Sequence, residues 1–334
     1  MSRRRVLTLL TAALVAALVV AWGVGRGPGS TPRRVADALA GAAAEDVPTE
    51  EVVLRVEGVA PIRMLLDTRD QVITRMMESG HWEETETRWF RRSIRPGDVV
   101  VDVGANVGYY TLLGARLVGE TGRVYAFEPD PTSFALLRRN VALNDLHNVV
   151  LEQKAVSDAP GRLRLFLASE NKGDHRIYQP PGEQRPSVEV EAVTLDGYFR
   201  EHPESVDLVK VDTQGAELLI LRGMQDLVRR ADSLVMVFEY SPMHLAGLGS
   251  QGHELLGLFE ALGLDLFDLG MGQPMPDRLR RANTSEMLKT FSPQSPLFTN
   301  LLLLKGRPDL LALMEQPVPV PVFTPRAAQR AESR

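Results

Sequence analysis

The sequence contains no cysteine among its 334 residues. This absence excludes disulfide bonds, zinc sites built from thiolates and a cysteine nucleophile. A surplus of positive charge is also lacking, because 38 lysines and arginines face 43 aspartates and glutamates and leave a net charge of −5. A chain of this charge has no overall attraction for a phosphate backbone, so we expect no nucleic acid among its partners.

Long apolar runs are scarce, which excludes a membrane protein with several spans. One such run covers residues 6–24, which are apolar apart from two threonines and a glycine. A helix of this length rises about 28 Å, close to the thickness of the hydrocarbon core of a bilayer. The run therefore predicts a membrane anchor within residues 1–30. A cleaved secretory signal and a twin-arginine export signal, suggested by Ser2-Arg-Arg-Arg-Val-Leu7, are the alternatives.

Beyond the anchor, the sequence divides into a linker, a folded domain and a tail. Residues 31–50 are small and flanked by proline, and they predict a linker. Residues 51–305 have the composition of a folded domain, which opens with a hairpin and helices over 51–95. Residues 306–334 predict a proline-rich disordered tail, because proline alternates with valine over 317–323.

Short apolar runs alternate with helical patterns over residues 96–305. The expected strands cover 99–103, 123–127, 149–151, 206–211, 234–239, 266–269 and 300–304, with a hairpin formed by 163–167 and 188–193. The expected helices cover 71–79, 83–93, 109–117, 132–144, 215–223 and 254–262. Apolar strands alternating with helices are typical of a doubly wound, Rossmann-like α/β sheet. Right-handed crossovers then bring the strand carboxyl ends, and a ligand site, to one edge.

A glycine-rich turn follows the first of these strands. It reads Asp102-Val-Gly-Ala-Asn-Val-Gly108 and leads directly into a helix. Gly104 permits a tight turn and a close approach of a ligand to the backbone. A dinucleotide fingerprint would read G-x-G-x-x-G, whereas this turn reads G-x-x-x-G with Asp102 two residues before it. A carboxylate suits a nucleoside that bears an ammonium group better than it suits a pyrophosphate.

Glu128 ends the next strand and should face the same edge of the sheet. A carboxylate at that position accepts the hydroxyl groups of a ribose in related folds. The alternative is a solvated turn residue beside Pro129 and Pro131. The turn and Glu128 together favour a nucleoside site.

Four motifs, taken in order, resemble the FkbM family of S-adenosylmethionine-dependent methyltransferases. They are Asp102-Val-Gly-Ala-Asn-Val-Gly-Tyr-Tyr110, Phe127-Glu-Pro-Asp130, Ala155-Val-Ser-Asp158 and Lys210-Val-Asp-Thr-Gln-Gly-Ala-Glu217. The resemblance implies a class I methyltransferase fold and S-adenosylmethionine as cofactor. It also implies transfer of a methyl group, typically to a hydroxyl oxygen. The expected acceptor is a sugar, a glycan or another hydroxylated metabolite.

The same resemblance implies roles for individual positions. The cofactor loop would comprise Asp102, Gly104, Asn106 and Gly108. Glu128 would hold the ribose, Ser157 and Asp158 would lie near the adenine, and Asp212 would lie near the methyl group and the acceptor.

Two side chains are candidates for catalysis on their own chemistry. Asp212 follows a strand on the same face as Lys210, where it either accepts the proton of a substrate hydroxyl or caps the next helix. His175 lies in the polar loop 171–178 and is a candidate general base near neutral pH. Arg176 beside it could bind an anionic group, although a solvated hairpin tip is the plainer interpretation of the loop. No spacing of histidines and carboxylates indicates a metal site.

Two other functions stay open at this stage: a nicotinamide-dependent oxidoreductase, and a non-catalytic, membrane-tethered module that binds a nucleoside. S-adenosylmethionine is a cytosolic metabolite, so we expect the catalytic domain on the cytoplasmic side of the membrane, with export as the alternative. The arginines on both sides of residues 6–24 do not decide this orientation.

Overall fold

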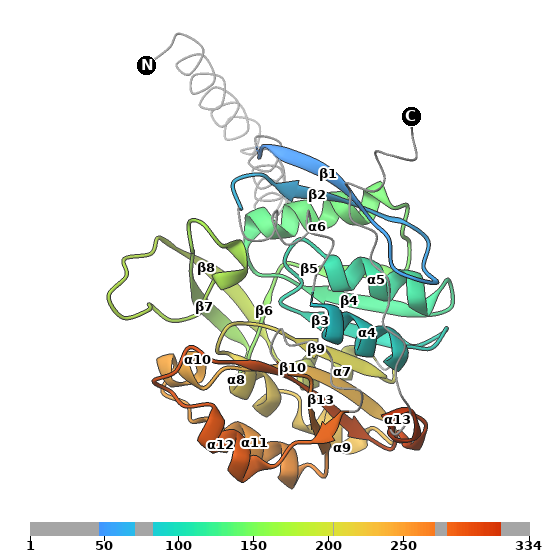
Figure 1. Cartoon of the computed structure of the whole chain (residues 1–334). Coiled ribbons are helices and arrows are strands. Elements are labelled where there is room, and N and C mark those ends of the chain that lie inside the picture. The colour runs from blue at the N-terminus through green and yellow to red at the C-terminus, as the bar shows by residue number, and fades with distance from the viewer. Residues whose placement is uncertain (1–46, 71–82, 203, 271–278, 315–334) are drawn as a thin grey trace, which may run out of the picture. The chain divides into compact units, whose positions relative to one another are not determined.

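The computed structural model describes residues 47–70, 83–202, 204–270 and 279–314 (Figure 1). The predicted anchor at residues 6–24 and the predicted helix at 71–79 lie outside these described residues. Within the described ranges, no helix has the length and apolar character needed to span a bilayer.

A mixed central sheet organises the described residues. Its eight strands lie in the order β12-β11-β13-β10-β9-β3-β4-β5. The parallel strands are β3 (Val99–Val103), β4 (Arg123–Phe127), β5 (Val149–Glu152), β9 (Leu208–Val211) and β10 (Leu234–Tyr240). The remaining strands are β11 (Asp265–Asp268), β12 (Arg280–Arg281) and β13 (Thr299–Lys305). The predicted α/β class is confirmed.

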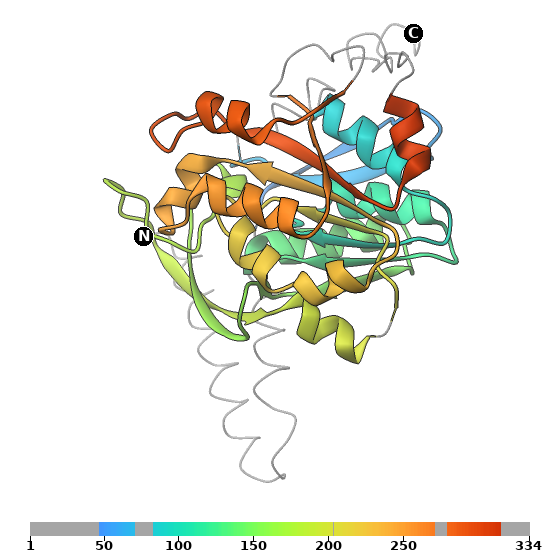
Figure 2. The ribbon, with the colours of Figure 1, turned by 90° about the horizontal axis from the view of Figure 1, so that it is seen from below.

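Helices cover both faces of the sheet, because its strands are apolar on both sides. Val100 belongs to one buried cluster and its neighbour Val101 to another, as the alternation of side chains along a strand requires. The first cluster packs under α4 (Glu84–Ser93), α5 (Tyr109–Val118) and α6 (Pro131–Leu143). The second packs under α7 (Leu195–Glu201), α8 (Glu217–Arg222), α9 (Gln225–Arg230), α10 (Pro242–Gly247), α11 (Gly252–Ala261) and α12 (Thr284–Thr290). Figure 2 shows α11 and α4 on opposite sides of the sheet.

The strand β13 runs against the direction expected for a purely parallel sheet. It pairs antiparallel with both β10 and β11, with Thr299 opposite Tyr240. After β12 the chain passes through α12 and enters β13 at the edge where the parallel strands end. It does not first cross back to the opposite edge, so β13 runs antiparallel to its neighbours. The amino end of β13, including Asn300, therefore lies at the edge where the parallel strands end.

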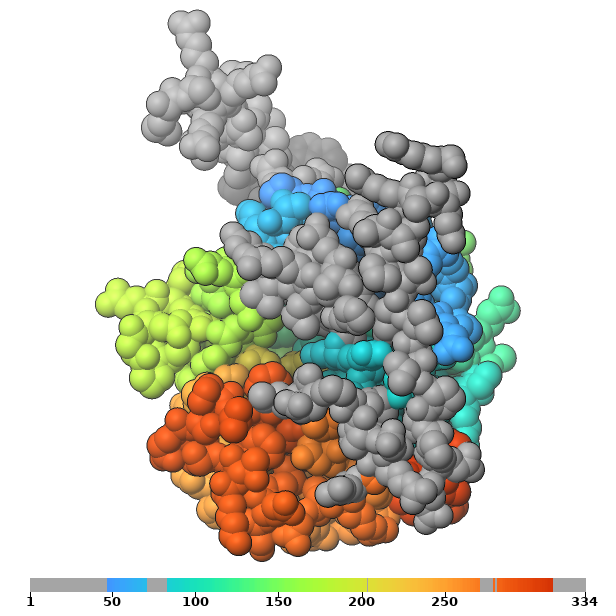
Figure 3. Space-filling model, viewed as in Figure 1, coloured from blue at the N-terminus to red at the C-terminus, as the bar shows by residue number. Residues whose placement is uncertain are grey.

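The predicted N-terminal hairpin is confirmed as β1 (Thr49–Leu54) paired with β2 (Ile62–Asp67). Two asparagines, one within α6 and one at its C-cap, hold it on the domain. The side-chain oxygen of Asn140 accepts from the amide of Leu65 at 2.7 Å, and that of Asn144 accepts from the amide of Arg63 at 2.9 Å. Figure 3 shows the hairpin above α4 on the viewed face, with the last described elements below it.

A separate three-stranded sheet follows β5. It contains β6 (Ala155–Val156), β7 (Gly161–Phe166) and β8 (Ser187–Val193). β7 and β8 form the predicted hairpin, paired antiparallel. Their connection contains a short 3₁₀ helix, Lys172–Asp174, and returns to the hairpin where the backbone of Arg176 pairs with that of Phe166.

The prediction of a disordered tail from residue 306 is wrong at its start, because α13 covers Pro308–Met314. Leu310 is fully buried and Met314 is 5% exposed, one helical turn apart on the face that meets the core. Arg307 anchors the start of this helix by donating to the carbonyl of Ser93 from both terminal nitrogens at 3.2 Å. The proline–valine stretch itself lies outside the described residues.

Candidate functional site

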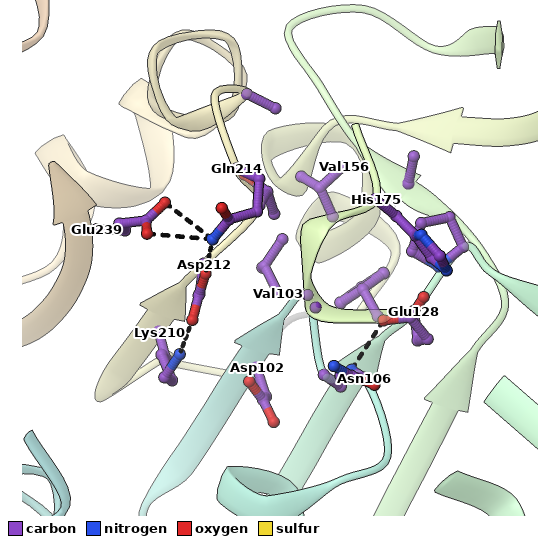
Figure 4. A pocket seen from close by; sticks show the side chains of 18 of the residues that line it. Asp102, Val103, Asn106, Glu128, Val156, His175, Lys210, Asp212, Gln214 and Glu239 are labelled. Carbon is purple, nitrogen blue, oxygen red and sulfur yellow. Dashed lines mark hydrogen bonds and ion pairs between the residues drawn. The ribbon is translucent and has the colours of Figure 1, made fainter. Parts of the chain in front are cut away.

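A cavity of about 350 Å³ opens at the edge where β3, β4, β9 and β10 end (Figure 4). The glycine-rich turn and Glu128 line one half of it. Lys210, Asp212, Gln214 and Glu239 gather in the other half. The topology of the sheet therefore brings the two predicted groups of residues to a single cavity.

The glycine-rich turn packs tightly against neighbouring backbone. Gly104 and Gly108 both have positive φ angles, of 83° and 102°. A β-carbon on Gly104 would lie 2.0 Å from the carbonyl oxygen of Asp212. The amides of Gly104 and Ala105 both donate to the carbonyl of Phe127 at 3.0 Å. These contacts fix the path of the turn, so the two glycines serve the fold as well as any ligand.

Glu128 is buried and tied to this turn. Its Oε2 accepts from the amide of Asn106 and its Oε1 accepts from the amide of Asp130, both at 2.8 Å. Burial, with Asp130 nearby, raises the pKa of Glu128 to about 8 despite these two hydrogen bonds. The alternative of a solvated turn residue is wrong. Each carboxylate oxygen keeps a second acceptor position, which is enough for two hydroxyl groups of a ligand.

Asp102 and Asn106 add polar groups to the same half of the cavity. Asp102 is 1% exposed and accepts from the hydroxyl of Thr111 at 2.6 Å. Burial raises the pKa of Asp102, although Lys210 and Thr111 oppose the shift. The side-chain oxygen of Asn106 is buried and has no hydrogen-bond partner among the described residues. A ligand with ammonium or hydroxyl donors would satisfy both side chains.

Lys210 lies at the centre of the other half. Its ammonium is 3.2 Å from Asp212 and 3.4 Å from Glu86, and 4.4 Å from the centre of the Tyr110 ring. Burial alone would lower the pKa of Lys210, but Asp212 and Glu86 outweigh it and raise that pKa well above its ordinary value. Glu86 lies on α4, and nothing in its local sequence indicated that it would reach this network.

Asp212 is oriented by two donors. One oxygen accepts from Lys210 at 3.2 Å, and the other accepts from the side-chain amide of Gln214 at 3.1 Å. The same amide donates to both oxygens of Glu239 at 3.1 Å. The Asp212 side chain keeps 30% of its surface exposed, whereas that of Glu239 keeps 6%. Asp212 is therefore the carboxylate of this group that a substrate can reach.

The capping alternative for Asp212 is wrong. Glu217 accepts from the amides of Thr213 at 3.0 Å and Gly215 at 2.9 Å, just before α8 begins. Within the described residues, the carboxylate of Asp212 accepts no hydrogen bond from a backbone amide of the helix. Glu217, in the first turn of α8, therefore has a structural role.

His175 lines the cavity but cannot act as the predicted general base. Its Nδ1 accepts from the amide of Ala168 at 3.0 Å, so the neutral ring carries its proton on Nε2. This nitrogen lies 3.8 Å from a carboxylate oxygen of Asp130. Burial lowers the pKa of His175 and keeps the ring neutral, although Asp130 opposes the shift. In Figure 4 the ring lies on the Glu128 side, away from Asp212.

Arg176 does not project into the cavity as a free anion receptor. It donates to Asp174 at 2.8 Å, to the hydroxyl of Tyr178 at 3.0 Å and contacts Nε2 of His244 at 3.2 Å. His244 lies on α10 and lines the cavity beside Glu239. Burial, with Arg176 nearby, lowers the pKa of His244 to about 4.

Ser157 and Asp158 are not among the described residues that line the cavity, and their place near a bound adenine stays a prediction. The wall at this place is formed by Lys154, Ala155 and Val156. The chain turns aside there because β6 pairs with β8 in the separate sheet, and the amide of Ser157 donates to the carbonyl of Val193 at 2.8 Å. No group of three or more histidines and carboxylates that could hold a metal ion occurs in the described part of the chain.

The FkbM methyltransferase domain model matches residues 102–266, which include the turn, Glu128 and Asp212. The chain belongs to the FkbM family of S-adenosylmethionine-dependent methyltransferases.

Three curated relatives illustrate how far the similarity extends. Methyltransferase sdnD of Sordaria araneosa is 31% identical, over 38% of this chain and 60% of the relative. The 31-O-demethyl-FK506 methyltransferase FkbM of Streptomyces tacrolimicus is 32% identical, over 40% of this chain and 62% of the relative. The 2-O-methyltransferase NoeI of Sinorhizobium fredii is 28% identical, over 45% of this chain and 66% of the relative. The chain thus spans between 60% and 66% of the length of these FkbM-type relatives.

The packing of the turn generates a stability prediction for this FkbM member. Gly104→Ala should lower the free energy of unfolding by about 3–5 kcal/mol, because the new methyl group meets the Asp212 carbonyl. Gly119→Ala is the matched control: Gly119 has a φ of 67° and no atom within 4 Å of an added β-carbon. It should cost only about 1–3 kcal/mol of backbone strain. Urea unfolding measures both, and equal losses would show that the close approach is unimportant.

The pKa of Glu128 generates a pH prediction. In the folded state the Glu128 carboxyl keeps its proton up to about pH 8, whereas in an unfolded chain it releases the proton near pH 4.5. Its contribution to stability is therefore present at low pH and is lost as the pH rises through this window. The stability of the wild type relative to Glu128→Gln should fall by on the order of 2–4 kcal/mol from about pH 5 to about pH 9.

Denaturant unfolding of the cofactor-free protein at several pH values measures this difference. The same measurements on Glu201→Gln, at an exposed position of α7, supply the matched control. A pH-independent difference for Glu128→Gln would mean that Glu128 is ionised throughout.

Proposed function

We propose that this protein transfers the methyl group of S-adenosylmethionine to a hydroxyl oxygen of a small molecule or glycan. The observation that carries the proposal is the link between Glu128 and the glycine-rich turn through the amide of Asn106 at 2.8 Å. That link places a buried carboxylate, suited to a ribose diol, beside a backbone turn in a cavity of about 350 Å³. Cavities that bind small molecules and cofactors have volumes of about 300–1,000 Å³.

The residues of this half of the cavity suit the cofactor. Glu128 has acceptor positions for the two ribose hydroxyls, and Asp102 offers a carboxylate to the ammonium of the methionine part. The unpartnered oxygen of Asn106 takes a further donor. Val103 and Val156 supply apolar wall for the adenine. Bound S-adenosylmethionine supplies a methyl group on a sulfonium, which is activated without acid catalysis.

Asp212 would receive the proton of the acceptor hydroxyl. The acceptor oxygen forms its bond to the methyl carbon while the carbon–sulfur bond breaks, and the hydroxyl proton passes to the Asp212 carboxylate. Lys210 and Gln214 hold that carboxylate from both sides, which fixes its orientation before a substrate arrives. Such positioned general bases contribute about 10²–10⁴-fold to a rate.

The choice of oxygen as the acceptor atom is supported by the names of two relatives. The relative from Sinorhizobium fredii is named a 2-O-methyltransferase, and that from Streptomyces tacrolimicus is named a methyltransferase of 31-O-demethyl-FK506. The polar half of the cavity agrees with a hydroxylated acceptor, since Asp212, Glu239 and Asn300 all line it.

Calorimetric titration tests the cofactor assignment. The full chain should bind S-adenosylmethionine, and NAD should not compete with it. Glu128→Ala should weaken this binding by about 1–3 kcal/mol, because the ribose hydroxyls lose their acceptor. Glu201→Ala, which removes an exposed carboxylate of α7, should leave the affinity unchanged. A folded protein that binds NAD and not S-adenosylmethionine would contradict the proposal.

Kinetics with an acceptor that the protein methylates test the role of Asp212. Asp212→Asn should lower kcat by about 10²–10⁴-fold, because the proton has no acceptor. The affinity for S-adenosylmethionine should stay within about twofold, since Asp212 lies in the other half of the cavity. Asp226→Asn, an exposed position on α9, is the control. A loss of cofactor affinity as large as the loss of kcat would instead assign Asp212 a structural role.

A further inference from the structure

Three arginines gather on one face of α4, away from the catalytic cavity. Arg88, Arg91 and Arg92 are spaced three and four residues apart, so they share one side of the helix. They line a second cavity of about 460 Å³ together with the turn Glu57–Val59 and Leu117. The charged residues among those described in this lining are three arginines and one glutamate.

The carboxylates near this cluster do not neutralise it. Arg88 is 4% exposed, and among the described residues its Nε has no hydrogen-bond partner and its ion-pair partner, Glu84, is 4.0 Å away. Arg91 also lies 4.0 Å from its acid, Glu57, whose side chain is 74% exposed. A buried guanidinium without close partners is costly, and burial lowers the pKa of Arg88. The site thus carries positive charge that the described residues leave uncompensated.

Ordinary helix electrostatics account for only part of this arrangement. Arg91 and Arg92 stand in the last turn of α4, where cations interact favourably with the helix dipole. Arg92 also lies over the ring of Trp89, with 5.7 Å from its guanidinium carbon to the ring centre. Arg88 stands one turn earlier and is buried against the cavity, where neither explanation applies.

We propose that this cavity binds the phosphate group of a phosphorylated ligand. Guanidinium groups bind phosphate oxygens through paired hydrogen bonds, and several converging forks suit a group with three or four oxygens better than a carboxylate with two. The cavity is larger than a phosphate ion, so the ligand carries an organic body. Val59 and Leu117 provide apolar contacts for that body.

The phosphate site is separate from the catalytic cavity. The described residues that line one cavity do not line the other, although α4 reaches both. Glu83, at the start of α4, lines the catalytic cavity, and a ten-residue helix spans about 15 Å. The proposal therefore does not rest on the methyltransferase activity and can be tested without it.

Calorimetric titration of the full chain with sn-glycerol 3-phosphate tests the site, with glycerol as the blank. Saturable binding is expected with a Kd of about 1 mM or tighter. The double variant Arg91→Gln/Arg92→Gln should weaken it by at least about tenfold, and Arg88→Lys, which keeps the charge but loses the fork, should weaken it less. Arg162→Gln, an exposed position on β7, should have no effect.

The binding of S-adenosylmethionine to the same variants separates this proposal from the proposed function, since it should be unchanged. Absence of phosphate-dependent binding, or binding that the double variant leaves intact, would overturn the phosphate site. Dihexanoyl phosphatidic acid, a short-chain lipid used below its micelle concentration, distinguishes the source. A Kd at least tenfold lower than that of glycerol 3-phosphate, lost in the double variant, would support a phospholipid ligand, and an equal Kd would support a free phosphorylated molecule.

Discussion

The hydrogen bond between the Asn106 amide and the Glu128 carboxylate is the contact on which the site depends. It joins the turn after β3 to the end of β4, and the bonds from the amides of Gly104 and Ala105 to the Phe127 carbonyl reinforce it. The turn cannot move outward without losing these bonds, and an added side chain at Gly104 would displace Asp212. The cofactor half and the acceptor half of the cavity are therefore held by one piece of packed backbone.

Around Lys210, the arrangement of charge decides which carboxylate can react. Glu86 and Asp212 both contact its ammonium, and Gln214 links Asp212 to Glu239. Burial raises the pKa of Glu86 to about 8 and that of Glu239 well above its ordinary value. Asp212 is more exposed and receives two donors, so it is the carboxylate that a substrate can reach.

Local patterns were enough to predict much of the sheet and one half of the site. The runs 99–103 and 123–127 match β3 and β4, because a buried parallel strand is apolar throughout and ends at a polar residue or glycine. Glu128 was predicted from its place at the end of the strand that follows the turn. The role of an imidazole depends on which ring nitrogen the backbone engages, and a local sequence pattern does not reveal this. In His175 the amide of Ala168 donates to Nδ1, so that nitrogen cannot accept a proton from a substrate. Ser157 lies outside the described cavity wall because pairing of β6 with β8 turns the chain away from that edge.

The sequence by itself determined the family, the order of strands and helices, and the polar residues at the strand ends, since each is written in a short stretch of chain. Only the tertiary structure decided the direction of β13, the packing of α13 and the partners of Lys210. Those features depend on contacts between segments far apart in the sequence, such as Glu86 of α4 with Lys210 of β9. The free energy of such contacts comes from burial and charge in three dimensions, which no local pattern records.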